Sequence, residues 1–266
     1  MFQLLFSFLS SFHNGFYAMA AYTRSRSRDL DAAGGSQAVS LWTATVQENR
    51  NNPELGFAGF DQPNRVIANL AYQVGGTTLG LFYEGGDFGR FSYTYSGNFG
   101  DASNRLMYVP NSASELNFQE FTLNGETVTA AQQAQLLDAY IDQDEYLSGI
   151  RGEIAERNGG VLPWVNRFDF RVLQDVNFFK KEGSPKLQLS LDFINIGNIF
   201  NSSWGIPQTP WQNNLLNFRE VNADGEPVYR LNTISGTTEF PTETFRSTTN
   251  VLNNSWRLQV GAKVIF

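Results

Sequence analysis

The sequence contains no cysteine and one histidine, His13, and these two shortages exclude several kinds of site. Without cysteine there is no disulfide, no zinc–thiolate site and no cysteine nucleophile. A single histidine beside a turn signal offers neither a catalytic triad nor a two-histidine metal site. The net charge of -7, with no long run of lysine or arginine, argues against a nucleic-acid partner.

Long apolar runs are also missing, so the sequence offers no candidate transmembrane helix. This absence does not exclude a membrane protein, because the strands of a transmembrane barrel alternate and average out in any hydropathy window. The aromatic content of 14% and the charged content of 17% are typical of a β-rich, partly lipid-facing protein.

Alternation of apolar and polar residues with a period of two is the main pattern in the chain, and it predicts seven strands of about ten residues. In the clearest segment, Asn166 to Phe178, Phe168 and Val172 share a face opposite Arg167, Asp169 and Arg171. The other segments are Phe2 to Phe12, Phe16 to Arg24, residues 65–74, 79–83 and 187–193, and the final Trp256 to Phe266.

Short and long connections follow one another in strict alternation between these segments. Tight turns are predicted at residues 13–15, 75–77 and 181–185, and long loops at 25–63, 85–163 and 198–254. An antiparallel meander with short turns at one end and long loops at the other is typical of bacterial outer-membrane barrels, with periplasmic turns and extracellular loops. The sequence therefore predicts an all-β fold, an antiparallel transmembrane β-barrel segment.

The long loops carry predicted structure of their own. Thr129 and Gln132 form a capping-box pattern that predicts one or two short helices up to Gly159-Gly160. Residues 91–95 are expected to extend a strand, and residues 218–229 around Asp224-Gly225 are expected to form a hairpin.

The first twenty residues allow two interpretations. Ala18-Met19-Ala20 after an apolar stretch resembles a signal-peptidase site. No positively charged region precedes that stretch, however, and Asn14-Gly15 is a tight-turn signal, so two strands are favoured.

Several motifs in order resemble the C-terminal barrel of TonB-dependent outer-membrane receptors, and within them the Oar-like branch of Bacteroidetes. They are Tyr83-Glu84-Gly85-Gly86, Gly89-Arg90-Phe91-Ser92-Tyr93, Leu106-Met107-Tyr108-Val109-Pro110, the run from Phe193 to Asn201, and Trp256-Arg257-Leu258-Gln259-Val260-Gly261. The resemblance covers essentially the whole chain, residues 1–266, and implies a barrel of about 22 strands filled by a plug. The chain would then be the last third of such a barrel, without the plug and the earlier strands.

The same resemblance implies the partners and the location. We expect outer-membrane lipid around the strands, the barrel-assembly machinery, and TonB acting through an N-terminal part that this sequence does not contain. The ligand cannot be identified from the sequence, and no cofactor is expected. Phe266, in register with Val264, Ala262, Val260 and Leu258, is expected to be the assembly signal.

Two further groups of residues are candidates for ligand contact. Charged residues on the polar strand faces could line a lumen or, equally, form interstrand ion pairs or plug contacts: Arg65, Asp169, Arg171, Asp175 and Arg257. The aromatic residues Trp204, Trp211 and Tyr229 of the last loop could contact a ligand or pack within the loop.

No metal site is expected. Asp142, Asp144 and Glu145 lack the pattern of a calcium loop and are expected on a solvated loop face. Residues 98–101 lack the oxygen ligands that relatives tend to carry before the Tyr-Val-Pro motif.

No arrangement of residues indicates an enzyme, and the resemblance to TonB-dependent receptors implies energy-coupled uptake of a scarce ligand. A small structural or adhesive outer-membrane barrel is one alternative, disfavoured by the odd number of strands and the missing signal peptide. A secreted carbohydrate-binding protein is the other, and it leaves the alternation of turns and loops unexplained.

Overall fold

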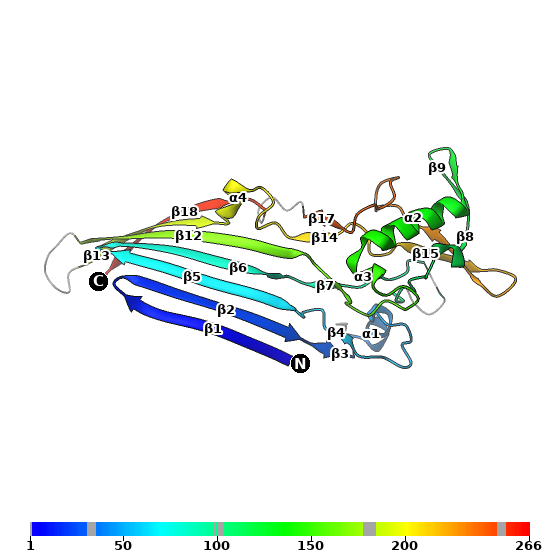
Figure 1. Ribbon diagram of the computed structural model, residues 1–266, viewed down its shortest axis with the longest axis horizontal. Helices are drawn as coiled ribbons and strands as arrows, with labels where there is room; N and C mark the ends of the chain where they lie inside the picture. The colour runs from blue at the N-terminus through cyan, green and yellow to red at the C-terminus, as the bar shows by residue number, and fades with distance from the viewer. Residues whose placement is uncertain (1, 31–35, 98, 100–103, 178–184, 249–253) are drawn as a thin grey trace.

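A computed structural model describes residues 2–30, 36–97, 99, 104–177, 185–248 and 254–266. All seven predicted strands are present, and they form one antiparallel sheet in the order β1-β2-β5-β6-β12-β13-β18 (Figure 1). The bounds are β1 (Phe2–His13), β2 (Phe16–Arg26), β5 (Asn64–Val74), β6 (Thr77–Asp87), β12 (Trp164–Asn177), β13 (Lys186–Ile194) and β18 (Arg257–Ile265). The order is linear, and β1 and β18 are the two edges of the sheet in the described part of the chain.

The two described tight turns, between β1 and β2 and between β5 and β6, lie at one end of this sheet, which is also where the C-terminus lies (Figure 1). Asn14 and Gly15 both have positive φ, of 51° and 81°, as a two-residue hairpin turn requires. A side chain at position 15 would also lie 2.2 Å from the Gln73 carbonyl oxygen, so glycine is needed there for space as well. The predicted turn at 181–185 and Phe178 fall almost wholly outside the described residues, although β12 pairs with β13 up to Asn177 and Lys186.

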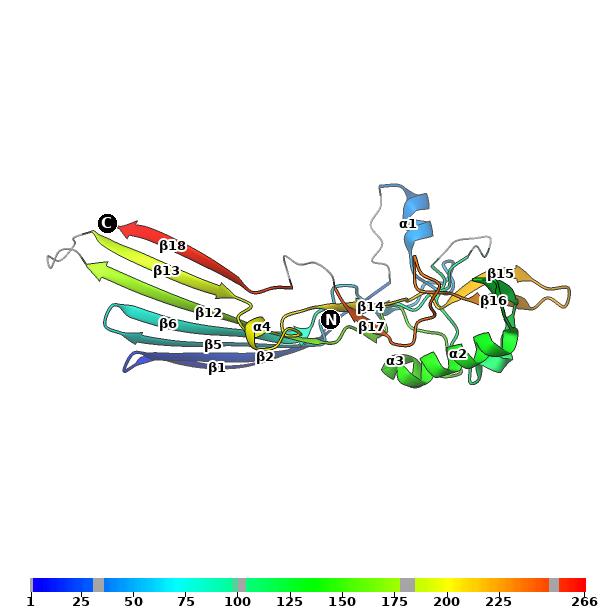
Figure 2. The ribbon, with the colours of Figure 1, turned by 90° about the horizontal axis from the view of Figure 1, so that it is seen from above.

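The register gives the sheet one apolar face and one polar face. Directly paired residues point to the same side of a sheet, so pairs such as Val172 with Leu191 and Leu191 with Val260 join three strands into one apolar surface. The sheet is also curved. Strands β1, β2, β5 and β6 lie side by side in the view of Figure 1, whereas β12, β13 and β18 lie side by side in the perpendicular view of Figure 2.

The long connections gather at the opposite end of the sheet, and we call the described residues within 27–63, 88–163 and 195–256 together the loop cap (Figures 1 and 2). Its strands are short, and eight of them form four antiparallel pairs: β3 (Arg28–Asp29) with β4 (Gly56–Phe57), β7 (Arg90–Phe91) with β11 (Gly160–Val161), β9 (Phe121–Leu123) with β10 (Glu126–Val128), and β14 (Gln208–Pro210) with β17 (Phe245–Ser247). A three-stranded sheet has β16 (Pro227–Leu231) at its centre. This strand pairs with β15 (Leu216–Val221) in antiparallel orientation and with β8 (Asn117–Phe118) in parallel orientation. Its helices are α1 (Ala38–Ala44), α2 (Ala130–Gln143), α3 (Glu145–Ser148), α4 (Gly197–Phe200) and a 3-10 turn at Ala113–Glu115.

The predicted helices are confirmed as far as Ser148, and the loop hairpin is confirmed, whereas the expected helical stretch beyond Ser148 is wrong, because Ile154 forms a β-bridge with Tyr108. Thr129 and Gln132 make both hydrogen bonds of the capping box at the start of α2, and β15 and β16 form the expected hairpin. The expected strand over residues 91–95 is wrong beyond Phe91. Tyr93 and Tyr95 are buried in the cap, and the amide of Tyr95 donates to the Arg105 carbonyl instead of continuing the sheet.

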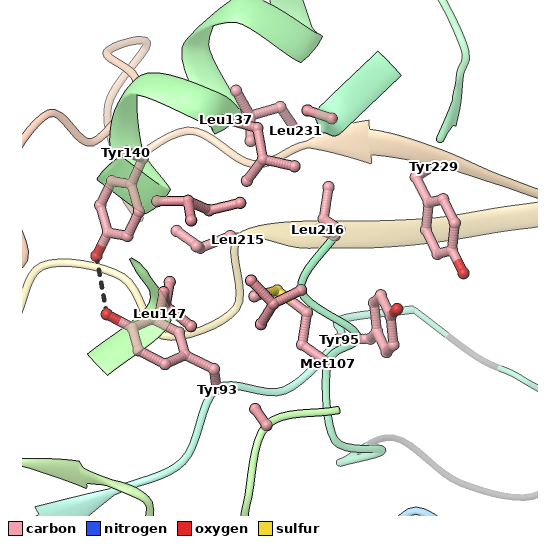
Figure 3. Packing of buried hydrophobic residues seen from close by; sticks show 14 residues of the cluster. Tyr93, Tyr95, Met107, Leu137, Tyr140, Leu147, Leu215, Leu216, Tyr229 and Leu231 are labelled. Carbon is pink, nitrogen blue, oxygen red and sulfur yellow. Dashed lines mark hydrogen bonds between the residues drawn. The ribbon is translucent and has the colours of Figure 1, made fainter. Parts of the chain in front are cut away.

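The hydrophobic core lies in the loop cap and draws every member from the second and third long connections (Figure 3). Side chains of α2, α3 and β16 meet those of the segment from Tyr93 to Val109. The fully buried members include Tyr93, Met107, Val109, Leu137, Ile141, Leu147, Leu215 and Leu216. This core is built from the long connections, and the seven-stranded sheet takes no part in it. The apolar face of the sheet is therefore left uncovered.

Candidate functional site

The apolar face of the sheet is exposed along its whole width. Leu70 on β5 is 43% exposed and Val260 on β18 is 72% exposed, although both lie on the side that carries most of the apolar residues of the sheet. Exposed contiguous apolar area of this extent marks a surface that is covered by another phase or partner. No helix in the described part of the chain is long and apolar enough to cross a membrane.

Aromatic residues form a row across this face where the sheet meets the loop cap. The Tyr83 ring packs against Phe168 at 4.9 Å between centroids, and Phe168 packs against Trp204 at 5.4 Å. Tyr83 and Trp164 both donate to the Asn166 side-chain oxygen, at 2.8 and 3.0 Å. Rings that keep an apolar body on the sheet and a polar group toward the cap are typical of a membrane–water interface.

The same arrangement recurs on β2. The Tyr22 hydroxyl donates to the Asn64 side-chain oxygen at 2.7 Å, and the Asn64 amide donates to Asp87 at 2.8 Å. Sequence analysis missed this row, because its members come from four separate segments. Tyrosine or tryptophan at the loop end of alternating strands was the signal that could have identified it.

The final strand continues the apolar face, with the alternation of apolar and polar residues that the sequence predicts. Leu258, Val260, Ala262 and Val264 pair with Phe193, Leu191, Leu189 and Leu187. Phe266 lies just beyond β18 and is 94% exposed. Its role as an assembly signal stays a prediction.

The five charged candidates all lie on the polar face, as the alternation predicts. Four of them have partners there: Arg65 pairs with Glu84 at 2.5 Å, Asp175 with Lys186 at 2.6 Å, Arg171 with Asp192, and Asp169 with Arg167 at 3.3 Å. Asp169 also accepts a hydrogen bond from the Asn195 amide at 2.7 Å. Arg257 makes no ion pair with any described residue. Three of these pairs join different strands, which favours the alternative of interstrand ion pairs for those residues.

The three loop aromatics do not form one cluster. Trp204 packs on Phe168 at the apolar face, and Trp211 stacks under the Arg246 guanidinium at 4.9 Å. Tyr229 is buried in the cap core, where its ring stacks on Tyr95 at 5.3 Å. For Tyr229 this arrangement favours packing within the loops over contact with a ligand.

Of the three acidic residues expected on a solvated face, Asp142 and Glu145 are exposed as expected, whereas Asp144 is buried. Its carboxylate begins α3 by accepting from the amides of Tyr146 and Leu147 at 3.0 and 2.8 Å. It also accepts from the hydroxyls of Tyr93 and Thr244 at 2.5 and 2.7 Å. Four donors replace water around the charge, so the burial is tolerated, and the carboxylate serves the cap's structure.

Buried tyrosines surround this carboxylate. Burial raises the pKa of Tyr93 well above its usual value, and the nearby Asp144 charge acts in the same direction. Burial likewise raises the pKa of Tyr95, Tyr140, Tyr146 and Tyr229. All five belong to the loop cap.

A cleft of about 540 Å³ lies between the cap and the loop end of the sheet. Phe91, Tyr146, Trp164 and Phe245 supply aromatic walls, and Asp87 and Glu145 are among its acidic lining residues. Among the described residues no cluster of three or more histidine, aspartate or glutamate side chains could hold a metal ion. The loop at 98–101 falls outside them, apart from Phe99.

No protein-family model matches the chain, and neither a curated protein nor a solved structure does.

Proposed function

We propose that the seven-stranded sheet is part of the wall of an outer-membrane β-barrel, and that the loop cap is its extracellular part. The observation that carries this proposal is the exposed apolar face, which continues from β1 to β18 while the only extensive core among the described residues lies in the cap. Lipid acyl chains would cover such a face without any further protein.

The lengths and connections of the strands support the same proposal. Six of the seven strands have between 9 and 12 residues and β12 has 14, close to the length a tilted strand needs to cross a bilayer. The described tight turns lie at one end and the cap at the other (Figure 1), and the aromatic row lies at the cap end of the apolar face. The C-terminus and the turns would then be periplasmic.

The edges of the sheet add a requirement. Backbone groups on the free edges of β1 and β18 cannot remain unpaired in lipid, so further strands must complete the wall. A receptor of the TonB-dependent type, importing a scarce ligand without catalysis, meets this requirement. That family assignment rests on the ordered motifs alone.

The exposed apolar face weighs against a secreted carbohydrate-binding protein, in which it would have to be a covered core. A small structural barrel remains compatible with the same face, and it differs in needing no plug and no energy coupling.

Cysteine accessibility tests the proposal, because the chain has no native cysteine. Single substitutions Ala223→Cys in the cap and Gln73→Cys at the turn end would be labelled with a membrane-impermeant maleimide in intact and in permeabilised cells. We expect Ala223→Cys to react in intact cells and Gln73→Cys to react only after permeabilisation.

The adjacent pair Asn69→Cys and Leu70→Cys is the matched control for the two faces of β5. Leu70→Cys should stay unreactive in membranes and react only after denaturation, because lipid would cover it. Asn69→Cys, on the polar face, should react in permeabilised cells without denaturation. Recovery of the chain in a soluble fraction, or equal labelling of Ala223→Cys and Gln73→Cys in intact cells, would refute the proposal.

A further inference from the structure

Three arginines follow one another at alternate positions where β2 leaves the sheet. Arg24 pairs with Leu4 and Arg26 pairs with Phe2, so both arginines lie on the apolar face. Arg28 on β3 pairs with Phe57 of β4. The intervening Ser25 and Ser27 are tied to the first long connection, since Ser25 donates to the Gln62 carbonyl and Ser27 to Asp61.

Arg24 and Arg26 are exposed and make no ion pair with any described residue. Arg28, in contrast, is paired with Glu156. Three guanidinium groups lie around the Phe57 ring, with that of Arg90 at 3.7 Å from its centroid, that of Arg28 at 4.6 Å and that of Arg26 at 5.3 Å. A cation–π contact of this kind restricts the guanidinium of Arg26 and does not use its hydrogen-bond donors.

Apolar and interfacial residues surround the two unpaired arginines. Phe2 and Leu4 lie beside them on the edge strand β1, and both are exposed. Tyr22, a member of the aromatic row, is two residues before Arg24 on the same face of β2. The surface therefore combines positive charge and apolar area at the height where the aromatic row marks the boundary of the apolar band.

Among the described residues, the opposite end of the apolar face carries no lysine or arginine. Its described residues near the tight turns are Phe16, Tyr72, Val74, Thr77, Val176, Leu187 and Val264, and none is lysine or arginine. In a chain with a net charge of -7, two exposed arginines that form no ion pair with a described residue are a local asymmetry at one end of this face.

We propose that Arg24 and Arg26, with Phe2 and Leu4, bind a phosphorylated acyl glycolipid of the lipid A class in the outer leaflet. The guanidinium groups would take a phosphate of the headgroup in forked hydrogen bonds, and the apolar side chains of β1 would contact the acyl chains. This inference rests on the proposed function, because it requires the cap end of the sheet to face the outer leaflet.

The test measures binding of fluorescent bisphosphorylated lipid A to the full chain in a neutral detergent. The double variant Arg24→Gln with Arg26→Gln should bind roughly 30-fold more weakly, since each arginine near an anionic headgroup contributes about a fivefold factor. The control is Arg257→Gln, which removes the same charge from the polar face and should change binding by less than about twofold.

Two further arms examine the chemistry. Lipid A without phosphates should bind the parent chain about as weakly as bisphosphorylated lipid A binds the double variant. The variant Arg24→Lys with Arg26→Lys should keep part of the affinity, because lysine retains the charge and lacks the fork. Matching urea midpoints for parent and variants would show that the sheet is intact.

Unchanged lipid A binding by the glutamine double variant would overturn the inference, as would an equal loss in Arg257→Gln. Equally tight binding of phosphatidylglycerol would overturn the glycolipid assignment in favour of a phospholipid. These measurements are made in detergent, so failure of the proposed function, seen as a soluble chain in cell fractions, is recognised separately.

Discussion

Asp144 connects two helices of the loop cap through a single buried carboxylate. Its oxygens accept from two backbone amides at the start of α3 and from the hydroxyls of Tyr93 and Thr244. Tyr93 lies 51 residues before Asp144 in the chain, and Thr244 lies 100 residues after it. The carboxylate therefore holds together parts of the cap that no short-range structure would join.

Substituting Asp144→Ala should open the cap locally, because four donors would lose a buried acceptor. We expect a cost of about 3 kcal/mol, on the order of 100-fold in the opening equilibrium. Native-state hydrogen exchange at the amides of Met107 and Ala155, which bond across the cap core, measures it. Asp142→Ala is the control: its exposed carboxylate pairs with Arg151, and its loss should cost less than about 0.5 kcal/mol. Equal exchange in the two variants would contradict the role given to Asp144.

At the scale of the element, β12 presents two chemically different faces to its neighbours. Val172 pairs with Leu79 and Leu191 on the apolar face, whereas Leu173 pairs with Thr78 and Ser190 on the polar face. These two adjacent residues are similar in size and hydrophobicity, so they separate the effect of the face from that of the residue type.

The substitution Val172→Arg should destabilise the membrane-inserted chain by about 2–4 kcal/mol, because it places a charge among acyl chains. Leu173→Arg on the polar face should cost much less. Urea titration of the chain in bilayers, followed by tryptophan fluorescence, measures both free energies of unfolding. If the two variants lost the same stability, the apolar face would not be the lipid-facing one.

The whole molecule consists of an uncovered sheet and a cap with its own core, and these parts should respond differently to alkaline pH. Among the cap tyrosines whose pKa is raised by burial are Tyr93, Tyr95, Tyr140, Tyr146 and Tyr229. A raised pKa means that the unfolded state loses these protons first. Cap stability should thus be fully present below about pH 10 and decline above it.

Absorbance at 295 nm follows this ionisation directly. We expect the five buried tyrosines to ionise only together with loss of the cap's near-ultraviolet circular dichroism, whereas the sheet's far-ultraviolet signal persists. Phenylalanine at Tyr93 removes one of these groups and is the variant for comparison. Smooth ionisation of all ten tyrosines near pH 10 with an intact cap would contradict the prediction.

The residues that local patterns describe correctly are those whose environment depends on their nearest neighbours in the chain. Alternation with a period of two placed Val172 and Arg171 on opposite faces, and Asn14-Gly15 predicted a turn that needs two positive φ angles. The capping box at Thr129 is likewise a contact between residues three positions apart. In each case the interaction is complete within a few residues, so the sequence alone determines it.

Only the tertiary structure decided which loop residues are buried. Asp144, Tyr93 and Tyr229 occupy polar or mixed segments whose patterns give no indication of a core, and their partners lie in other connections. The aromatic row, too, depends on how β2, β6 and β12 are aligned in register. Burial and register are set by packing between distant segments, and that information is absent from the period of any single strand.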